Sequence, residues 1–231
     1  MTCDVIATGS RGNAVVLDGV YLIDCGVPMS KLTKYIKKLR MVFLTHIHTD
    51  HFNAATIRKL HEHRPGLRFV CCRNLLVPLC TDAKVNPDNV TVLEAGQTAV
   101  FPHEPCGELR VSPFGLIHNA PNVGWIFRSG NGSALYATDA QYIPVDAPGL
   151  DLYMVECNYK GDDLERRKER KMATGGFIYE DAVAVAHMSF ETVMGWLSTN
   201  ATPHSKVVFL HQHVEKEEVP DGVDRSTSGT A

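Results

Sequence analysis

Short apolar runs recur along the chain, and most of them end in turn residues or in a single polar side chain. Runs of this length, bounded by glycine, proline, asparagine or aspartate, are typical of buried strands. They predict strands at residues 5–8, 14–17, 20–26, 41–44, 67–72, 90–94, 109–117, 124–128, 134–139, 150–158 and 206–211.

Helical patterns alternate with these strands. Residues 30–40 form a basic amphipathic pattern, and residues 53–64 form a second one that Pro65 and Gly66 end. Further helices are predicted at 74–80, 162–171 and 190–199. The alternation predicts an α/β protein in which helices cover the sheets.

Length and composition add mild limits. The 231 residues can bury one substantial core, so we expect a single domain at residues 1–214 and a frayed tail at residues 215–231, which is acidic and then rich in Gly, Ser and Thr. The net charge of −3 argues mildly against a protein that binds long nucleic acid by bulk electrostatics. Seven cysteines without zinc-ribbon spacing, no signal peptide and no apolar run that could span a bilayer favour a reduced protein of the cytoplasm.

The densest chemistry follows the apolar residues 41–44. Here His46, His48, Asp50 and His51 fall within six consecutive residues. His46 and His48 alternate, so both point the same way in an extended chain. Imidazole and carboxylate groups are ligands of zinc, manganese and iron, which favours a metal site over a polar loop with histidines by chance.

This His-x-His-x-Asp-His sequence resembles the signature of the metallo-β-lactamase-fold superfamily, and within it the phosphodiesterase branch that contains ribonucleases Z and J. Residues 9–13 and 22–26 are similar to segments that begin its nuclease-like members. The resemblance implies a four-layer αββα sandwich with two divalent metal ions, zinc or alternatively manganese. Asp24 either accepts a hydrogen bond from a ligand histidine or is only a turn residue.

The resemblance also implies the ligand set. It places His46, His48 and His118 on one ion, and Asp50, His51 and His211 on the other. Asp139 would bridge the two ions, which would share a hydroxide that attacks phosphorus. His213 competes with His211, which fits better because it directly follows an apolar run.

Glu156 and His187 loosely match two further family elements. The resemblance implies that His187, oriented by Glu156, is the general acid for the leaving oxygen; alternatively, His187 only caps a helix. The charged run at residues 162–171 is either an exposed helical face or a source of cations for a phosphate.

Two substrate classes and one non-catalytic alternative remain. The chain is similar in size and layout to phage anti-Pycsar proteins, which degrade cyclic CMP and cyclic UMP as homodimers, in the host cytoplasm if phage-encoded. By this resemblance, a partner loop, here residues 161–176, covers the site. The alternative is a small ribonuclease Z-like or ribonuclease J-like nuclease, although no long insertion provides a substrate-gripping arm. A non-catalytic metal-binding module would fill the same ligand positions without hydrolysis.

Overall fold

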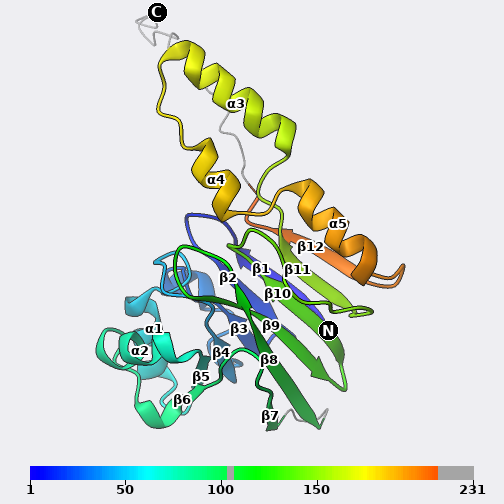
Figure 1. Cartoon of the computed structure of the whole chain (residues 1–231). Helices are drawn as coiled ribbons and strands as arrows, with labels where there is room; N and C mark the ends of the chain where they lie inside the picture. Colours follow the sequence, from blue (N-terminus) through cyan, green and yellow to red (C-terminus); the bar gives the residue numbers. More distant parts are fainter. Residues whose placement is uncertain (103–106, 213–231) are drawn as a thin grey trace, which may run out of the picture.

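Two six-stranded mixed sheets pack face to face in the computed structural model, which describes residues 1–102 and 107–212 (Figure 1). The first sheet has the order β1-β2-β3-β4-β5-β6 and the second has the order β12-β11-β10-β9-β8-β7. The first sheet comprises β1 (Cys3–Ala7), β2 (Ala14–Leu17), β3 (Tyr21–Ile23), β4 (Met41–Phe43), β5 (Arg68–Cys71) and β6 (Val90–Val92). The second comprises β7 (Ala99–Pro102), β8 (Glu108–Leu116), β9 (Asn122–Ser129), β10 (Gly132–Ala137), β11 (Leu152–Glu156) and β12 (Lys206–Leu210).

Helices cover the outer face of each sheet. They are α1 (Ala54–His63), α2 (Leu76–Thr81), α3 (Gly161–Thr174), α4 (Glu180–Ala186) and α5 (Phe190–Asn200), with short 3-10 turns η1 (Met29–Leu32), η2 (Arg73–Leu75) and η3 (Pro87–Asn89). Helices α1 and α2 pack on the first sheet, and α5 packs on the second. In Figure 1, α3 and the top of α4 project beyond the two sheets. The predicted αββα sandwich is confirmed.

Alternation along the strands builds three apolar layers. In β4, Val42 faces α1 and its neighbours, whereas Phe43 faces the second sheet. The Phe43 ring lies edge-on to Trp125 and Phe127, with ring centroids 5.5 Å and 5.0 Å away. Such edge-to-face pairs add stabilisation beyond the buried area, so Phe43 joins the sheets at the centre of the core.

Strand direction determines where functional side chains gather. Strands β3, β4, β5 and β6 are parallel to one another, and so are β10, β11 and β12. Parallel strands end at the same edge of a sheet. Polar residues that follow several of these strands therefore meet at one edge of the sandwich.

Several elements differ from the sequence prediction, and one of them, α4 at Glu180–Ala186, was not predicted as a helix. The helix expected at residues 30–40 is the 3-10 turn η1 followed by turns, although the amphipathic pattern is right, since Leu32 and Leu39 are buried. The Arg64 side chain donates to the carbonyl oxygens of Ile36 and Lys37 at 2.8 Å and 2.7 Å, so these acceptors are not used by a further helical turn. Strand β7 was not predicted, because its short Ala-Val-Phe-Pro sequence lacks a strong strand pattern.

The predicted tail at residues 215–231 lies outside the described residues. Within the described part, no helix combines the length and the apolar character needed to cross a membrane.

Candidate metal centre

The predicted ligands gather where strand ends of both sheets meet. They follow β4 (His46, His48, Asp50 and His51), β8 (His118), β10 (Asp139) and β12 (His211). Glu156 is the last residue of β11, and His187 follows α4. Each of these side chains except Asp50 lies within hydrogen-bond distance of another member of the set. The Asp50 carboxylate is slightly farther, 3.6 Å from His51 Nε2.

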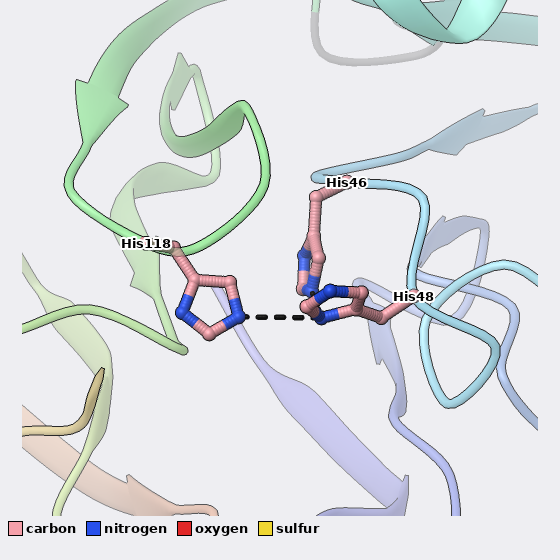
Figure 2. Close-up of side chains that lie close together, drawn as sticks. All are labelled: His46, His48 and His118. Atoms are coloured by element: carbon pink, nitrogen blue, oxygen red, sulfur yellow. Dashed lines mark hydrogen bonds between the residues drawn. The ribbon is translucent and has the colours of Figure 1, made fainter. Parts of the chain in front are cut away.

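Three histidines form the first group. His46 Nε2 lies 3.0 Å from His48 Nδ1, which lies 3.2 Å from His118 Nε2. Figure 2 shows the three rings pointing toward one another from two separate loops. A chain segment after β4 and another after β8 thus bring three imidazole nitrogens to one point.

The chemistry of this first group fits a cation. Burial, together with the nearby His51, lowers the pKa of His46 to about 2, so its ring is neutral at ordinary pH. Burial also lowers the pKa of His118. The imidazole nitrogens of the three rings face one another at 3.0–3.2 Å, and three imidazole nitrogens around a shared centre are the donor set that a zinc ion binds.

Asp139 is the centre of the second group. Its Oδ2 atom lies 2.7 Å from His51 Nε2, and its Oδ1 atom lies 2.9 Å from His211 Nδ1. Asp50 is more distant, with Oδ2 3.6 Å from His51 Nε2. His46, His51 and Asp139 also lie close enough to share an ion, so the two groups are contiguous.

Opposite charges balance in the second group. Burial opposes the charge on His51, yet Asp24 and Asp139 together raise the pKa of His51 to about 10. Likewise, against the effect of burial, Asp139 and Glu156 raise the pKa of His211 to about 10. Hydrogen bonds from these two histidines hold the pKa of Asp139 well below its usual range, although burial alone would raise it. The ring nitrogens of His51 and His211 that face Asp139 therefore carry protons where they would otherwise bind a metal ion.

Three residues of the site and its support have a left-handed backbone conformation. Asp24, Asp139 and His211 have φ angles of 58°, 54° and 51°. Each follows the end of a strand and is not glycine, so the conformation carries a cost that the surrounding contacts must offset. Such strain at strand ends is typical of functional sites, because it directs a side chain away from its ordinary position.

Asp24 supports His51 from behind. Its fully buried carboxylate accepts hydrogen bonds from His51 Nδ1 at 2.7 Å, from the backbone N of Thr45 at 2.9 Å and from the Tyr136 hydroxyl at 3.0 Å. This contact leaves His51 Nε2 directed at Asp139. Both readings of Asp24 hold, since it is a strand-end turn residue and it also orients a candidate ligand.

A glycine-rich loop completes the support. Asn13 Nδ2 lies 2.7 Å from His51 Nε2 and 3.3 Å from Asp50 Oδ2. The segment after β3 also approaches the motif closely, because Gly26 has no side chain and a Cβ atom there would lie 1.7 Å from the carbonyl oxygen of Asp50. Backbone contact therefore fixes the segment that carries Asp50.

Glu156 and His187 lie at the rim of the second group. Glu156 Oε1 lies 2.6 Å from His187 Nδ1 and 3.0 Å from His211 Nδ1. The His187 ring is also 3.5 Å from Asp139 Oδ1. Glu156 is fully buried, whereas 18% of the His187 side chain is exposed. His187 is thus held by a buried carboxylate and remains open to solvent.

The structure brings together every residue predicted for the site. Which of them bind metal or transfer protons stays a prediction. His61 and His63 lie in α1. His61 Nε2 accepts a hydrogen bond from the backbone N of Asn86 at 3.2 Å and its ring lies edge-on to Phe69, whereas His63 Nδ1 contacts the carbonyl oxygen of Lys59 in the same helix at 2.8 Å. His213 lies outside the described residues.

Several supporting residues were missed. Asn13, Thr45 and Asn122 contact the motif or the turn at Asp139, and the Tyr136 hydroxyl donates to Asp24 behind His51. Asn122, for example, donates to the carbonyl oxygens of Thr138 and Asp139 at 3.0 Å and 2.8 Å. Only Asn13 carried a signal, since it belongs to the glycine-rich segment of the family resemblance.

Comparison with known families agrees with this geometry. A family model described as a beta-lactamase superfamily domain matches residues 21–212. The chain belongs to this superfamily. Most members of the superfamily are hydrolases, and the His and Asp groups of this chain could hold metal ions. No curated protein matches the sequence.

Solved structures of the superfamily share the fold at low sequence identity. The metallo-beta-lactamase fold protein YhfI from Bacillus subtilis has a TM-score of 0.66 at 18% identity, over 93% of this chain and 87% of that chain. Human tRNase Z, short form, has a TM-score of 0.60 at 15% identity, over 92% of each chain. Zn²⁺-bound PqqB from Methylobacterium extorquens has a TM-score of 0.61 at 15% identity, over 92% of this chain and 89% of that chain.

Proposed function

We propose that this chain is a metal-dependent phosphodiester hydrolase that opens 3′,5′-cyclic mononucleotides such as cyclic CMP and cyclic UMP, like the phage anti-Pycsar proteins it resembles. The observation that carries the proposal is the Glu156–His187 pair, which lies 3.5 Å from Asp139 at the rim of the second group. A hydrolase of phosphodiesters must protonate a leaving oxygen, and this pair provides a group for that step.

The metal ligands follow the two groups. We assign His46, His48 and His118 to one ion, and Asp50, His51 and His211 to the other, with Asp139 between them. Zinc is the preferred ion, since imidazole predominates, and manganese is the alternative. When bound, the ions would activate water and stabilise negative charge on the phosphoryl oxygens.

His187 supplies the proton in this proposal. Its Nδ1 atom faces Glu156 Oε1 at 2.6 Å, so Nδ1 carries a proton and the carboxylate fixes the ring. When the ring carries a second proton on Nε2, Nε2 donates that proton to the leaving oxygen, and the neutral ring stays bound to Glu156 through Nδ1. Because the side chain is 18% exposed, it can meet a substrate that approaches from solvent.

Charge and layout favour a small substrate. The net charge of −3 offers little bulk attraction for long nucleic acid, whereas a cyclic mononucleotide needs only a local site. Short connections join most of the strands, and the α3–α4 segment is the main projection from the sandwich (Figure 1).

A nuclease is the second candidate, because human tRNase Z shares the fold and α3 carries a basic face. An RNA substrate would use the same two groups and the same Glu156–His187 pair. The difference between the two functions lies in what surrounds the centre, so substrate turnover must decide between them.

The projection also supports a homodimer. Apolar side chains on it are exposed, namely Met172 at 60%, Phe177 at 85% and Val185 at 62%. Large apolar side chains that are exposed on a projecting segment favour contact with another protein surface. The segment 161–176 expected as a covering loop is mostly the helix α3, stabilised against α4 by the ion pair of Lys168 with Asp181 at 2.6 Å. In a homodimer, α3 would therefore cover the partner's site as a preformed helix and not as a flexible loop.

A substrate panel tests the proposal. The full chain, supplied with zinc or with manganese, is incubated with the 3′,5′-cyclic forms of CMP, UMP, AMP and GMP, with RNA and single-stranded DNA oligomers, and with a precursor transfer RNA. EDTA is the blank. Hydrolysis of cyclic nucleotides alone supports the proposal, and cleavage of the oligomers or the precursor alone establishes the nuclease instead. Metal binding without hydrolysis of any of these substrates would refute both functions.

A further inference from the structure

The loop between β1 and β2 contacts the candidate metal centre on both sides. On the side of the second sheet, the backbone N of His211 donates to the Thr8 hydroxyl at 2.6 Å. A Cβ atom on Gly9 would lie only 3.5 Å from the His211 ring. On the side of the first sheet, the backbone N of Asn13 donates to the carbonyl oxygen of Asp50 at 2.6 Å. The loop therefore joins the two segments that carry the ligands proposed for the second ion.

A tight turn forms the tip of this loop. The backbone N of Gly12 donates to the carbonyl oxygen of Gly9 at 2.9 Å, so Ser10 and Arg11 are the two central residues of the turn. Both glycines have positive φ angles, 104° and 136°, which other residues rarely adopt. A Cβ atom on Gly12 would lie 2.5 Å from the carbonyl oxygen of Gly26. Glycine at these positions thus allows the turn to lie directly against the segment after β3.

The buried Asn13 side chain holds the turn in place. Its Oδ1 atom accepts a hydrogen bond from the backbone N of Gly9 at 2.8 Å. Its Nδ2 atom lies 2.7 Å from His51 Nε2 and 3.3 Å from Asp50 Oδ2. One side chain thus contacts both the turn and two candidate metal ligands. Because these contacts already order the turn, binding a ligand there costs little conformational entropy.

Arg11 is the cation at the tip of the turn. Its side chain is exposed, and within the described chain it has no hydrogen-bond or ion-pair partner. The nearby Asp139 carboxylate already pairs with His51 and His211 at 2.7 Å and 2.9 Å. An arginine side chain stays protonated at any ordinary pH. Arg11 therefore presents a free positive charge beside the centre.

The position of Arg11 suits a phosphate bound at the second ion site. The ends of a four-residue turn lie within about 7 Å of each other, so Arg11 is close to Gly9 and to the His211 ring beside it. The long, flexible arginine side chain can cover this short distance. Its planar guanidinium donates two parallel hydrogen bonds to phosphate oxygens, a geometry that lysine does not match.

We propose that Arg11 binds the phosphate of the substrate, by donating from its guanidinium to the non-bridging oxygens. The inference rests on the proposed function in that the substrate is a phosphodiester, and it deepens that function by adding a residue outside the ligand set and the Glu156–His187 pair. The contact exists in the bound substrate as well as in the transition state. Its loss should therefore raise KM and leave kcat nearly unchanged.

Equilibrium binding tests the proposal without turnover. The full chain, loaded with zinc and freed of unbound ion, is titrated in a calorimeter with cytidine 5′-monophosphate and, separately, with inorganic phosphate. Arg11→Gln should weaken the binding of both by about tenfold or more, because it removes charge-assisted hydrogen bonds. Arg11→Lys keeps the charge without the paired donors, so its affinity should lie between the two. The zinc content of both variants should equal that of the unaltered chain.

Arg40→Gln is the matched control. Arg40 is also exposed, but it directly precedes β4, whereas the histidine motif follows β4, so Arg40 lies at the opposite edge of the first sheet. This variant should bind both ligands like the unaltered chain. With whichever substrate the panel identifies, Arg11→Gln should raise KM by a factor similar to its loss of affinity.

The results separate this inference from the proposed function. If the unaltered chain hydrolyses no substrate of the panel, the proposed function fails, while the phosphate titration still decides the role of Arg11. Unchanged binding of both ligands by Arg11→Gln would overturn the inference, as would a lack of phosphate binding by the unaltered chain. Loss of zinc from Arg11→Gln, or a fall in kcat at constant KM, would also overturn it. Equal weakening in Arg40→Gln would do the same, because overall charge would then determine binding.

Discussion

Replacing Asp24 by asparagine tests how far the hydrogen bond from His51 to Asp24 supports the second candidate ion site. Asp24 Oδ1 accepts from the backbone N of Thr45, and Oδ2 accepts from His51 Nδ1 and the Tyr136 hydroxyl. In Asp24→Asn the amide oxygen keeps the Thr45 contact, which leaves the NH₂ group facing His51. An NH₂ group only donates, so His51 Nδ1 must become an acceptor and the proton moves to Nε2. That nitrogen then has no lone pair for a metal ion.

The size of the effect follows from the contact. A hydrogen bond to a charged group contributes about 1.5–3 kcal/mol, and changes to the residues behind a ligand histidine typically weaken metal binding by about 10–100-fold. The 2.7 Å distance and the complete burial of both side chains favour the upper part of this range. The ion held by His46, His48 and His118 should bind nearly as before, because none of these rings contacts Asp24.

Competition with a chromophoric zinc chelator separates the two binding steps. The expected result is one ion bound normally and a second bound about 10–100-fold more weakly. Asp18→Asn is the control, since Asp18 also follows a strand with a left-handed φ of 49° but lies at the other end of the sheet. Equal weakening of both ions would mean that Asp24 acts through the fold as a whole, and unchanged binding would refute its role on His51.

Three further predictions follow from the site. His187→Ala should keep both ions and lower turnover by roughly 10²–10⁴-fold, measured on whichever substrate the panel identifies; near-normal turnover would remove His187 from the mechanism. Because the pKa values of His51 and His211 are raised to about 10, both rings hold protons at pH 7, and metal binding there should release about two protons and strengthen as pH rises toward 10. Calorimetry in buffers with different ionisation enthalpies counts these protons, and no release at pH 7 would contradict the assignment. Gly26→Ala should lower the free energy of unfolding by at least about 2 kcal/mol in denaturant titration, because the new Cβ would meet the carbonyl oxygen of Asp50. Gly66→Ala is the control and should change this free energy little, since no atom lies within 4 Å of a Cβ there. Equal losses in the two variants would show that the close approach at Gly26 does not matter.

Residues that end apolar runs could be placed from sequence. His46, His118, Asp139 and His211 each follow a strand-like pattern, and the parallel strands carry them to one edge. Their convergence needed the family resemblance to propose, because the segments are far apart in the chain. The αββα sandwich was predicted from the same resemblance, whereas the strand order within each sheet was not predicted.

Contacts made across the sandwich could not be predicted. Tyr136 reads in sequence as an ordinary strand residue, yet its hydroxyl reaches Asp24 in the other sheet. The charged run at 162–171 could equally be a solvated face, and only the structure shows that Arg167 is buried in it. Residues 30–40 were predicted as a helix because the spacing of buried residues resembles that of a helix, whereas the backbone hydrogen bonds there are those of a 3-10 turn and further turns.

The division of the candidate ligands between the two sheets has a mechanical consequence. His51 comes from the first half of the chain, and Asp139 and His211 come from the second. An ion held by all three would act as a crosslink across the seam of the sandwich, so the halves could not part without releasing it. Loss of such an ion would therefore shorten the lifetime of the folded chain against proteases.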